Sequence, residues 1–387
     1  MAPALITLPK LMMVGEGASA LVADAMAKLG VSRPLIVTDA FMRDSGVVDR
    51  ITGPLDEAGI EWALFADTVP DPTTEAIERG VARIGDGDFD SLIALGGGSP
   101  MDTAKAMAVL ASHGGAMRDY KVPAQVDRAD YPIIAIPTTA GTGSEVTRFT
   151  VITDTDTDEK MLCMGMAYVP ACALVDYTLT LTMPWRLTAD TGIDTLTHAI
   201  EGYVSKKHNP FADSMAISCM GLVARNIRTA CNEPDNRAAR EAMMLAATQG
   251  GMAFSNSSVC LVHGMSRPIG AHFHVPHGLS NAMLLPAVTA FSARDATPRY
   301  ADCARAMGVA TSDVGDQAAV AMLLDELRQL NTDLKVPSPK AYGIDEKRYF
   351  ELSATMAEQA LASGSPGNNP RVPSADEITK LYEEVWA

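Results

Sequence analysis

Four short aliphatic segments in the first half of the chain constrain its fold more than any other feature. Each is brief, rich in aliphatic residues and followed by Gly, Asp or Thr, as buried strands are. They are PLIVTDA (34–40), SLIALGG (91–97), PIIAIPTT (132–139) and ACALVDY (171–177). Residues 18–30 and 73–85 have helical spacing and end at Gly. Strands that alternate with helices in this way predict a parallel sheet with helical crossovers.

The second half of the chain has a different character. Strand signals become scarce after about residue 184, and helical patterns dominate. The clearest of these patterns are 212–230, 237–254 and 319–330. A chain of 387 residues also exceeds what one ordinary core supports. We therefore expect two domains, an α/β domain over 1–180 and an all-α domain over 181–387.

The charge balance limits the partners that the chain can have. It carries 47 acidic and 31 basic residues, a formal net charge of −16. Such a surface repels phosphate backbones and anionic lipids, so neither nucleic acid nor a membrane is expected as a partner. No apolar run reaches the length of a membrane span, and the first residues lack the basic segment of a signal peptide. The six cysteines form no CxxC pair, which fits a soluble protein of the reducing cytoplasm.

A glycine-rich turn, LGGGSPMDTAKAMAVL (95–110), follows one of the predicted strands and opens a helix. Its three successive glycines allow a sharp turn and a close approach to a ligand. Ser99 is expected at the N-cap of the helix and Pro100 at the first helical position. The free N–H groups and the positive end of the helix dipole then form a site for a pyrophosphate. A glycine-rich turn that only packs is the alternative.

Asp39 closes the strand that ends in LIVTD. An acidic residue at such a strand end can accept hydrogen bonds from an adenosine ribose and repel a 2′-phosphate, which favours NAD over NADP. A role as a turn or helix-cap residue explains Asp39 equally well.

Four of the seven histidines fall within the segment HGMSRPIGAHFHVPHG. A separate segment, TGIDTLTHAIEGYVS, carries Asp194 and His198 at helical positions i and i+4, which share one helix face. That pair alone is a weak metal signal, but it becomes stronger together with His263 and His277. Three imidazoles and one carboxylate form a suitable shell for a divalent ion such as Fe²⁺ or Zn²⁺.

Several motifs together resemble those of the iron-containing (group III) alcohol dehydrogenases, and the resemblance spans nearly the whole chain. The motifs are GGGSPMDTAKA, IPTTAGTGSEVTRFTVITD, TGIDTLTHAIEGYVS, LVHGMSRPIGAHFHVPHGLSNAMLLP and NNPR. The resemblance implies a dehydroquinate synthase-like architecture, in which a Rossmann-like first domain binds NAD(P) and a helical second domain supplies the metal ligands. It also implies a homo-oligomer, most simply a twofold dimer.

The same resemblance assigns roles to individual residues. The implied metal ligands are Asp194, His198, His263 and His277. The implied cofactor-binding residues are Gly96, Gly97, Gly98, Ser99, Asp102, Thr138, Thr139, Thr142 and Lys160. Phe149 and Phe254 fall where relatives line the substrate pocket, although core packing is an equally good interpretation. His272 lies outside the ligand set and is expected to border the substrate, whereas His274 is expected to orient a neighbouring residue.

Arg267 stands one helical turn after His263, where many relatives have a histidine that is thought to help move the substrate proton. A guanidinium stays protonated at any working pH, so the proton must take another route, through water or His272. One interpretation of Arg267 is a structural ion pair at the domain interface. The other is a fixed charge that orients an anionic group of the substrate or the cofactor. Because Pro268 follows Arg267, the helix is expected to bend or end there.

The reaction that the resemblance implies is reversible hydride transfer between a primary alcohol and NAD, with the metal polarising the substrate oxygen. One alternative is a metal- and NAD-dependent lyase or cyclase of the dehydroquinate synthase type, which shares the glycine turn and the metal-bearing helices. A metal hydrolase would need a general base beside the metal, and none stands out. A non-catalytic assembly protein would have no need for a complete ligand set.

Overall fold

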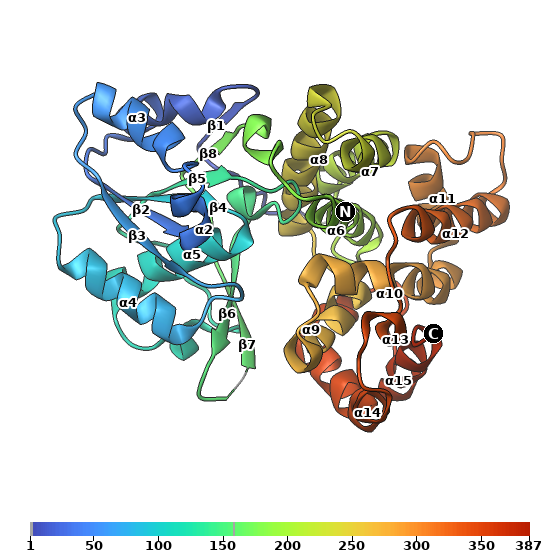
Figure 1. Cartoon of the computed structure of the whole chain (residues 1–387). Helices are drawn as coiled ribbons and strands as arrows, with labels where there is room; N and C mark the ends of the chain where they lie inside the picture. Colours follow the sequence, from blue (N-terminus) through green and yellow to red (C-terminus); the bar gives the residue numbers. More distant parts are fainter. Residues whose placement is uncertain (1–2, 158) are drawn as a thin grey trace. The chain divides into compact units, whose positions relative to one another are not determined.

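The computed structural model describes residues 3–157 and 159–387, and the chain forms two compact units (Figure 1). The first unit spans Thr7–Thr182 and contains every β-strand of the described residues. The second spans Met183–Ala387 and includes residues 3–6. Among the described residues of this second unit, every regular element is a helix. The predicted fold class, an α/β domain followed by an all-α domain, is confirmed.

A six-stranded parallel sheet forms the centre of the first unit, in the order β1-β8-β5-β4-β2-β3. The strands are β1 (Leu11–Val14), β2 (Pro34–Asp39), β3 (Ala63–Thr68), β4 (Ser91–Gly96), β5 (Ile133–Pro137) and β8 (Cys172–Val175). The four aliphatic segments of the sequence form β2, β4, β5 and β8. The other two strands lie at the edges of the sheet and are only partly buried. Partial burial does not demand a continuous aliphatic run, and the sequence therefore marks them less clearly.

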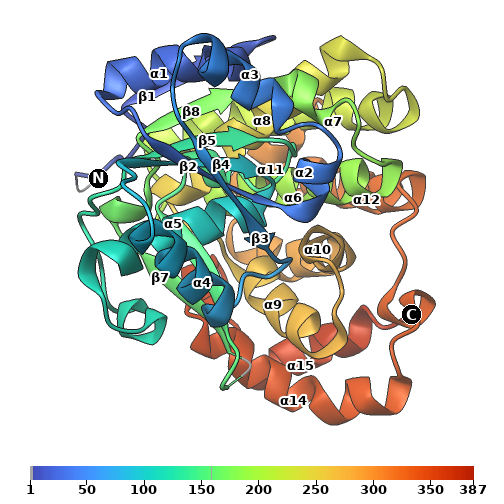
Figure 2. The same ribbon diagram turned by 60° about the vertical axis from the view of Figure 1, so that its left-hand side comes forward.

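Helices cover both faces of the sheet, as the two views in Figures 1 and 2 agree. α1 and α3 pack against one face, on strand residues such as Ile36 and Ile93. α4 and α5 pack against the other, on Leu35 and Leu92. Successive strand residues thus point to opposite, equally buried faces. The helical segments of this unit are η1 (Ala18–Leu21), α1 (Val22–Leu29), α2 (Ala40–Asp44), α3 (Asp49–Glu57), α4 (Thr74–Gly85), α5 (Gly98–His113), η2 (Met117–Tyr120), η3 (Ser144–Val146), η4 (Met166–Tyr168) and η5 (Tyr177–Thr180).

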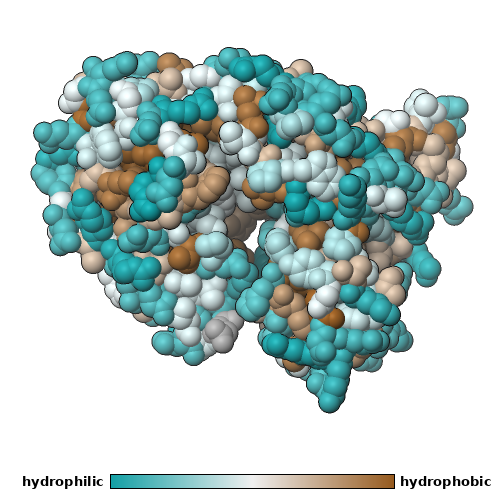
Figure 3. All heavy atoms as spheres, in the orientation of Figure 1, coloured by the Kyte–Doolittle hydropathy of each residue, from teal (hydrophilic) through white to brown (hydrophobic). Residues whose placement is uncertain are grey.

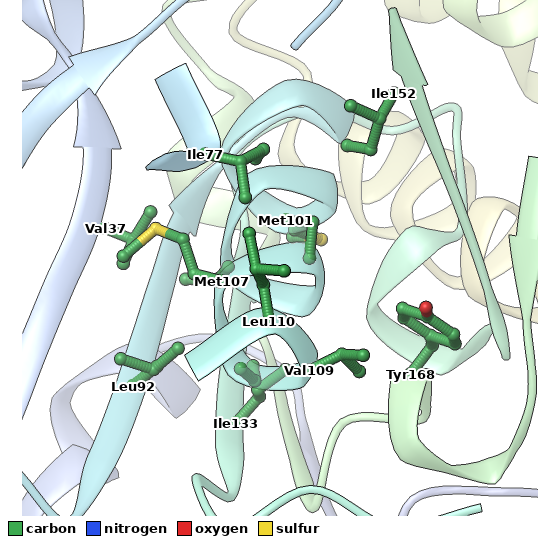
Figure 4. Close-up of a cluster of buried hydrophobic side chains, with 14 of the residues drawn as sticks. Val37, Ile77, Leu92, Met101, Met107, Val109, Leu110, Ile133, Ile152 and Tyr168 are labelled. Atoms are coloured by element: carbon green, nitrogen blue, oxygen red, sulfur yellow. The ribbon is translucent and has the colours of Figure 1, made fainter. Parts of the chain in front are cut away.

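The core on the α5 side of the sheet is drawn in Figure 4. Successive turns of α5 contribute Met101, Met107 and Leu110, which pack among Leu92 and Ile133 of the sheet. Because α5 directly follows the glycine-rich turn, this packing holds the first turn of the helix at the end of β4.

A second, two-stranded sheet belongs to the same unit. It is an antiparallel hairpin of β6 (Phe149–Asp154) and β7 (Glu159–Met164), which the sequence analysis did not predict. Its strands alternate between buried and half-buried residues, because only one face packs on the core. The hairpin therefore lacks the uniform aliphatic pattern of the central strands.

Lys105 ties the loop that precedes this hairpin to α5. The Lys105 side chain is fully buried, and its Nζ lies within 3.1 Å of five oxygen atoms on Ser144, Thr147 and Phe149. Burial lowers the pKa of Lys105 to about 8, against the attraction of Asp102 and other acidic groups. The Lys105 ammonium group thus attaches this loop to a core helix.

The second unit is organised around α6 (Trp185–Val204). This helix is buried along most of its length and packs against α7, α8 and α10. It carries buried polar residues, among them Asp194, His198 and Glu201, whose polar groups need partners inside the protein. The remaining helices are α7 (Pro210–Asn232), α8 (Arg237–Asn256), α9 (Leu261–Phe273), α10 (His277–Ser292), η6 (Ala293–Asp295), α11 (Thr297–Ala306), α12 (Asp316–Asp333), α13 (Pro339–Tyr342), α14 (Glu346–Ala362), η7 (Ser365–Asn368) and α15 (Ala375–Glu384).

Hydrophilic residues predominate on the face drawn in Figure 3, and apolar residues form only small groups among them. This distribution fits the strongly acidic composition of the chain. Within residues 3–157 and 159–387, no helix combines the length and the apolar character that crossing a bilayer requires.

We expect the Lys105→Met substitution to lower the free energy of unfolding by about 2–4 kcal/mol, because it leaves buried loop oxygens without their donor. Chemical denaturation followed by circular dichroism measures this change. Lys28→Met, which replaces an exposed lysine of α1, is the control and should change stability by no more than about 0.5 kcal/mol. Equal effects of the two substitutions would contradict the role of Lys105 in holding this loop to α5.

Candidate functional site

The candidate metal centre begins with Asp194 and His198 on α6. They are four residues apart, so they lie on the same face of the helix, as the sequence predicts. Their exposed fractions are only 2% and 4%. Phe254 of α8 covers the His198 ring, with the ring centroids 4.3 Å apart and nearly parallel. The aromatic contact places Phe254 beside this predicted ligand.

Two further histidines reach the same point from other helices. His263 lies in the first turn of α9, and His277 is the first residue of α10. The start of α10 packs closely on α6, because a Cβ atom at Gly278 would come within 2.5 Å of the backbone oxygen of Asp190. The absence of a side chain at Gly278 therefore lets His277 approach α6.

The three predicted histidine ligands converge on one carboxylate oxygen of the fourth, Asp194. The Nε2 atoms of His263, His277 and His198 lie 3.5, 3.8 and 3.9 Å from Oδ1 of Asp194. Ligand atoms of Asp194, His263 and His277 all lie within 4.8 Å of one another, and His198 stacks on the His263 ring at 4.6 Å. The structure thus brings together residues that the chain separates by more than sixty positions.

Charge and exposure in this cluster suit a cation. Burial alone would raise the pKa of Asp194, but the imidazoles of His198, His277 and His263 outweigh it and hold that pKa well below its usual value. Burial would likewise lower the pKa of His263, yet hydrogen bonds to Asp194 and Glu201 raise it to about 9. Only the His277 side chain is substantially exposed, at 47%, so the cluster is open on that side.

Asn281 supplies a direct test of whether this donor set fits a metal. Its Nδ2 lies 2.6 Å from Oδ1 of Asp194 and 3.2 Å from the Nε2 atoms of both His263 and His277. When both imidazoles present unprotonated Nε2 atoms, as metal ligands do, three acceptors face this one NH₂ group, which has only two hydrogens to donate. A divalent cation accepts three or more lone pairs, and one carboxylate with imidazoles is a donor set that Fe²⁺ tolerates well. The residues present therefore fit a divalent metal.

Arg267 and His272 lie further along α9, which continues through Pro268 to Phe273. Of the two expectations for Pro268, a bend or an end of the helix, the end is therefore wrong. Nη1 of Arg267 donates to Oγ of Ser365 over 3.1 Å. Nε2 of His272 lies 2.8 Å from Oε1 of Gln359 on α14, and His272 does not join the group around Asp194.

His274 ends α9 in the left-handed conformation, with φ 55°. His274 is exposed and is not among the residues grouped around Asp194.

The candidate cofactor site lies where the connections of the parallel sheet diverge. β2 and β4 are neighbours, but the chain leaves β2 toward β3 on one side and β4 toward β5 on the other. Open α/β sheets bind their ligands at the carboxyl ends of strands at such a switch point. Asp39 ends β2, the glycine turn follows β4, and the threonine-rich loop follows β5.

The glycine turn differs in one detail from the prediction. α5 begins at Gly98 with Gly97 as its N-cap, so the placement of Ser99 at the N-cap and Pro100 at the first helical position is wrong. Gly96 has a φ of 143°, which turns the chain into the helix two residues earlier than expected. Gly97 has no side chain with which to cap α5, and this leaves N–H groups of the first turn for a ligand.

The missing side chains let the threonine-rich loop pack closely on the glycine turn. A Cβ atom at Gly98 would lie 3.1 Å from Thr142, and one at Gly97 would lie 3.4 Å from Thr139. The hydroxyl of Thr138 is buried without a hydrogen-bond partner among the described residues. The uncapped N–H groups of α5 next to an unsatisfied hydroxyl fit a bound dinucleotide, which would supply hydrogen-bonding groups for both.

Other predicted cofactor residues are engaged within the protein. The carboxylate of Asp102 accepts from Oγ of Ser144 over 3.0 Å and from the Val151 N–H over 2.9 Å. Lys160 pairs with Asp71, with Nζ and Oδ1 2.9 Å apart.

Asp39 and Phe149 also have structural roles. Oδ1 of Asp39 accepts from the Met42 N–H over 2.8 Å and caps α2, as the alternative interpretation of this residue expected. Phe149 opens β6, where it is partly buried, and its backbone oxygen accepts a hydrogen bond from Lys105.

Comparisons with known proteins identify the family of the chain. Residues 9–177 match the family model described as iron-containing alcohol dehydrogenase, and residues 188–386 match the C-terminal model of the Fe-containing alcohol dehydrogenase family. Lactaldehyde reductase of Escherichia coli (strain K12) is 35% identical over 374 residues, which cover 96% of this chain and 97% of that protein. The chain belongs to the iron-containing alcohol dehydrogenase family.

Solved structures of this family have the same fold. A crystal structure of 1,3-propanediol oxidoreductase superposes with a TM-score of 0.95 at 33% identity, over 99% of this chain and 100% of that one. Sulfoacetaldehyde reductase from Bifidobacterium kashiwanohense, solved in complex with NAD⁺, superposes with a TM-score of 0.90 at 28% identity over 100% of both chains. The predicted family and the oxidoreductase class are confirmed, and nothing among these relatives supports the dehydroquinate synthase alternative.

The sequence did not single out two residues that lie next to the cluster. Asn281 lies one turn after His277 on α10, and Glu201 lies seven residues after Asp194 on α6. Helical spacing alone indicates that each can share a face with a ligand. Polar residues at helical spacing are too common, however, to be singled out without the packing of the helices.

We predict that His263→Ala and His277→Ala each weaken the binding of Fe²⁺ by about 100-fold or more, because each removes a ligand rather than a residue that supports one. Elemental analysis after anaerobic reconstitution and gel filtration measures the bound iron. His208→Ala is the control, since His208 belongs to the same unit but faces Asp213 at 3.4 Å. Full iron occupancy in either ligand variant would show that the assigned shell is wrong.

Proposed function

We propose that the protein catalyses reversible, NAD-linked oxidation of a primary alcohol to an aldehyde, with one iron ion held by Asp194, His198, His263 and His277. The observation that carries this proposal is the approach of three imidazole Nε2 atoms to within 3.9 Å of a single buried carboxylate oxygen. Family membership supports the reaction type, because lactaldehyde reductase and 1,3-propanediol oxidoreductase interconvert alcohols and aldehydes by their names.

The metal and NAD supply the chemistry, as a Lewis acid for the substrate oxygen and as a hydride acceptor respectively. The protein contributes a buried, pre-arranged set of donors and a site that is open at His277. Phe254 stacks on His198 and keeps that ring in one orientation, which also makes the edge of the site apolar. Water that enters by this open side can accept the proton that an alcohol releases, without a carboxylate as base.

NAD binding is assigned to the carboxyl ends of β2, β4 and β5. The first turn of α5 is placed to hold the pyrophosphate through its N–H groups, with the threonine loop beside it. Asp39 uses Oδ1 to cap α2 and keeps its second carboxylate oxygen for a ribose, which favours NAD over NADP. The complex of sulfoacetaldehyde reductase with NAD⁺ supports this choice of cofactor.

Arg267 is proposed to select the substrate by charge. Burial lowers the pKa of Arg267, and the attraction of Glu201 opposes that change. Within the described residues of the helical unit, its guanidinium forms no ion pair with a carboxylate and contacts a serine instead. The only hydrogen bond that it makes in this part of the chain is to Ser365. A partly desolvated guanidinium with donors to spare is suited to an anionic substrate group.

We also infer a homodimer in the cytoplasm. All six cysteines are free and buried, as in proteins of reducing compartments. The edge strand β1 ends in Val14, which is 54% exposed. Leu8, which precedes this strand, is 39% exposed. An apolar, unpaired strand edge is a common surface for contact with a second copy of a chain.

The proposed activity is tested by incubating iron-reconstituted protein with NAD or NADP and a series of primary alcohols, and by following the ultraviolet absorbance of the reduced cofactor. We expect turnover with NAD and less with NADP. Metal removal by a chelator should abolish turnover, and iron should restore it. Turnover that survives complete removal of the metal would refute the proposed mechanism.

The role of Arg267 predicts a difference between substrate classes. Arg267→Ala should lower kcat/KM for acidic aldehydes, such as semialdehydes, by about 10-fold or more, because a charge-assisted hydrogen bond is lost. Neutral aldehydes of similar size should be affected much less. Arg267→Lys keeps the charge and should retain part of the preference. Equal losses for both classes, with an unchanged KM for NAD, would leave Arg267 with a structural role only.

A further inference from the structure

Glu201 is a buried carboxylate at the metal centre that is not part of the proposed ligand set. It lies three residues after His198 on α6 and is only 3% exposed. Its Oε2 lies 2.7 Å from Nδ1 of His263 and accepts the Cys260 N–H over 2.9 Å. Its Oε1 accepts the Val262 N–H over 2.6 Å. All three contacts reach the first turn of one helix, α9.

The contact with His263 determines which ring nitrogen faces the metal. An ionised carboxylate only accepts hydrogen bonds, so Nδ1 of His263 must carry the hydrogen in this contact. Nε2 of the same ring lies 3.5 Å from Oδ1 of Asp194, within the cluster of proposed ligand atoms. The imidazole is thereby held with Nδ1 as donor and Nε2 toward the metal. Histidine ligands commonly depend on such a partner for their orientation and basicity.

The two backbone contacts fix the helix that carries His263. Cys260 is the N-cap residue of α9 and makes no capping bond with its own side chain. Glu201, from a different helix, takes that place by accepting from Cys260 and Val262. A negative charge at this end also interacts favourably with the helix dipole. Two helices that each carry proposed ligands are therefore joined by one side chain.

We propose that Glu201 is the positioning residue of the metal centre, which both orients His263 as an Nε2 ligand and anchors the start of α9 on α6. This proposal rests on the metal site assigned above. A purely structural cap would make the two backbone contacts without any effect on the His263 ring. The two roles therefore predict different results for metal binding.

The Glu201→Gln substitution tests the proposal, and the state of the His263 ring distinguishes the two roles. A glutamine has nearly the same shape, but it replaces one acceptor oxygen with an NH₂ donor, and three donors then face a single acceptor oxygen. His263 is left either without its acceptor or with the opposite tautomer, in which Nε2 carries the hydrogen. We expect the affinity for Fe²⁺ and Zn²⁺ to fall by about 10- to 100-fold, measured by competition with a chelator.

A spectroscopic measurement reports on the ring itself. In wild-type protein loaded with Zn²⁺ as a diamagnetic probe, the Nδ1–H of His263 should give a far-downfield, slowly exchanging proton signal, assigned by its loss in His263→Ala. In Glu201→Gln that signal should shift upfield or exchange rapidly. A cap without an effect on the ring would leave it unchanged.

The control is Asp213→Asn, which removes a carboxylate of the same unit that pairs with Arg299 rather than with a proposed ligand. It should retain the metal affinity of the wild type. If Glu201→Gln folds and binds metal within about threefold of the wild type, the proposal is overturned. If Glu201→Gln does not fold, the wild-type spectrum decides, because absence of the downfield His263 signal overturns the proposal.

The same experiment distinguishes this proposal from the proposed function. Wild-type protein that binds no metal, or His263→Ala protein that keeps it, would refute the metal site itself. Normal loss of metal in His263→Ala, with full affinity in Glu201→Gln, would refute only the role of Glu201.

Discussion

The helical unit depends on the burial of one charge. Asp194 is 2% exposed in the middle of α6, where an uncompensated carboxylate would be strongly destabilising. The compensation comes from the imidazoles of His198, His263 and His277 and from the amide of Asn281. These groups belong to α6, α9 and α10, so the three helices must meet at this carboxylate. The groups that compensate the buried charge of Asp194 also form the donor set for a cation.

The α/β unit contains a buried charge of the opposite sign. Lys105 has no exposed surface, and neutral oxygens of the loop before β6 surround its ammonium group. Asp102, one turn earlier on α5, accepts hydrogen bonds from Ser144 and Val151 of the same region. A loop held by buried charges at several points loses little entropy when a ligand binds. These contacts hold the segment that follows the threonine-rich loop against α5.

The sequence-based predictions are accurate for features set by local pattern and fail for features set by contacts between distant residues. Strands β2, β4, β5 and β8 were found because full burial on both faces demands an unbroken aliphatic run. The hairpin of β6 and β7 was missed because only one of its faces is buried. The start of α5 was placed two residues late, since Ser and Pro are good capping residues but the conformation of Gly96 allowed an earlier turn. The contacts of Glu201 and Asn281 had no local signal at all.

The sequence by itself determined the features that depend on neighbours along the chain. These are the alternation that produces a parallel sheet, the glycine turn at the end of a strand, and the placement of Asp194 and His198 on one helix face. The resemblance to a family added His263 and His277 to the ligand set, although their spacing in the chain does not require it. Only the tertiary structure decided that their Nε2 atoms meet Asp194 and that Glu201 holds the opposite side of the His263 ring. Those relations connect residues on separate helices, and helix periodicity cannot specify how separate helices pack.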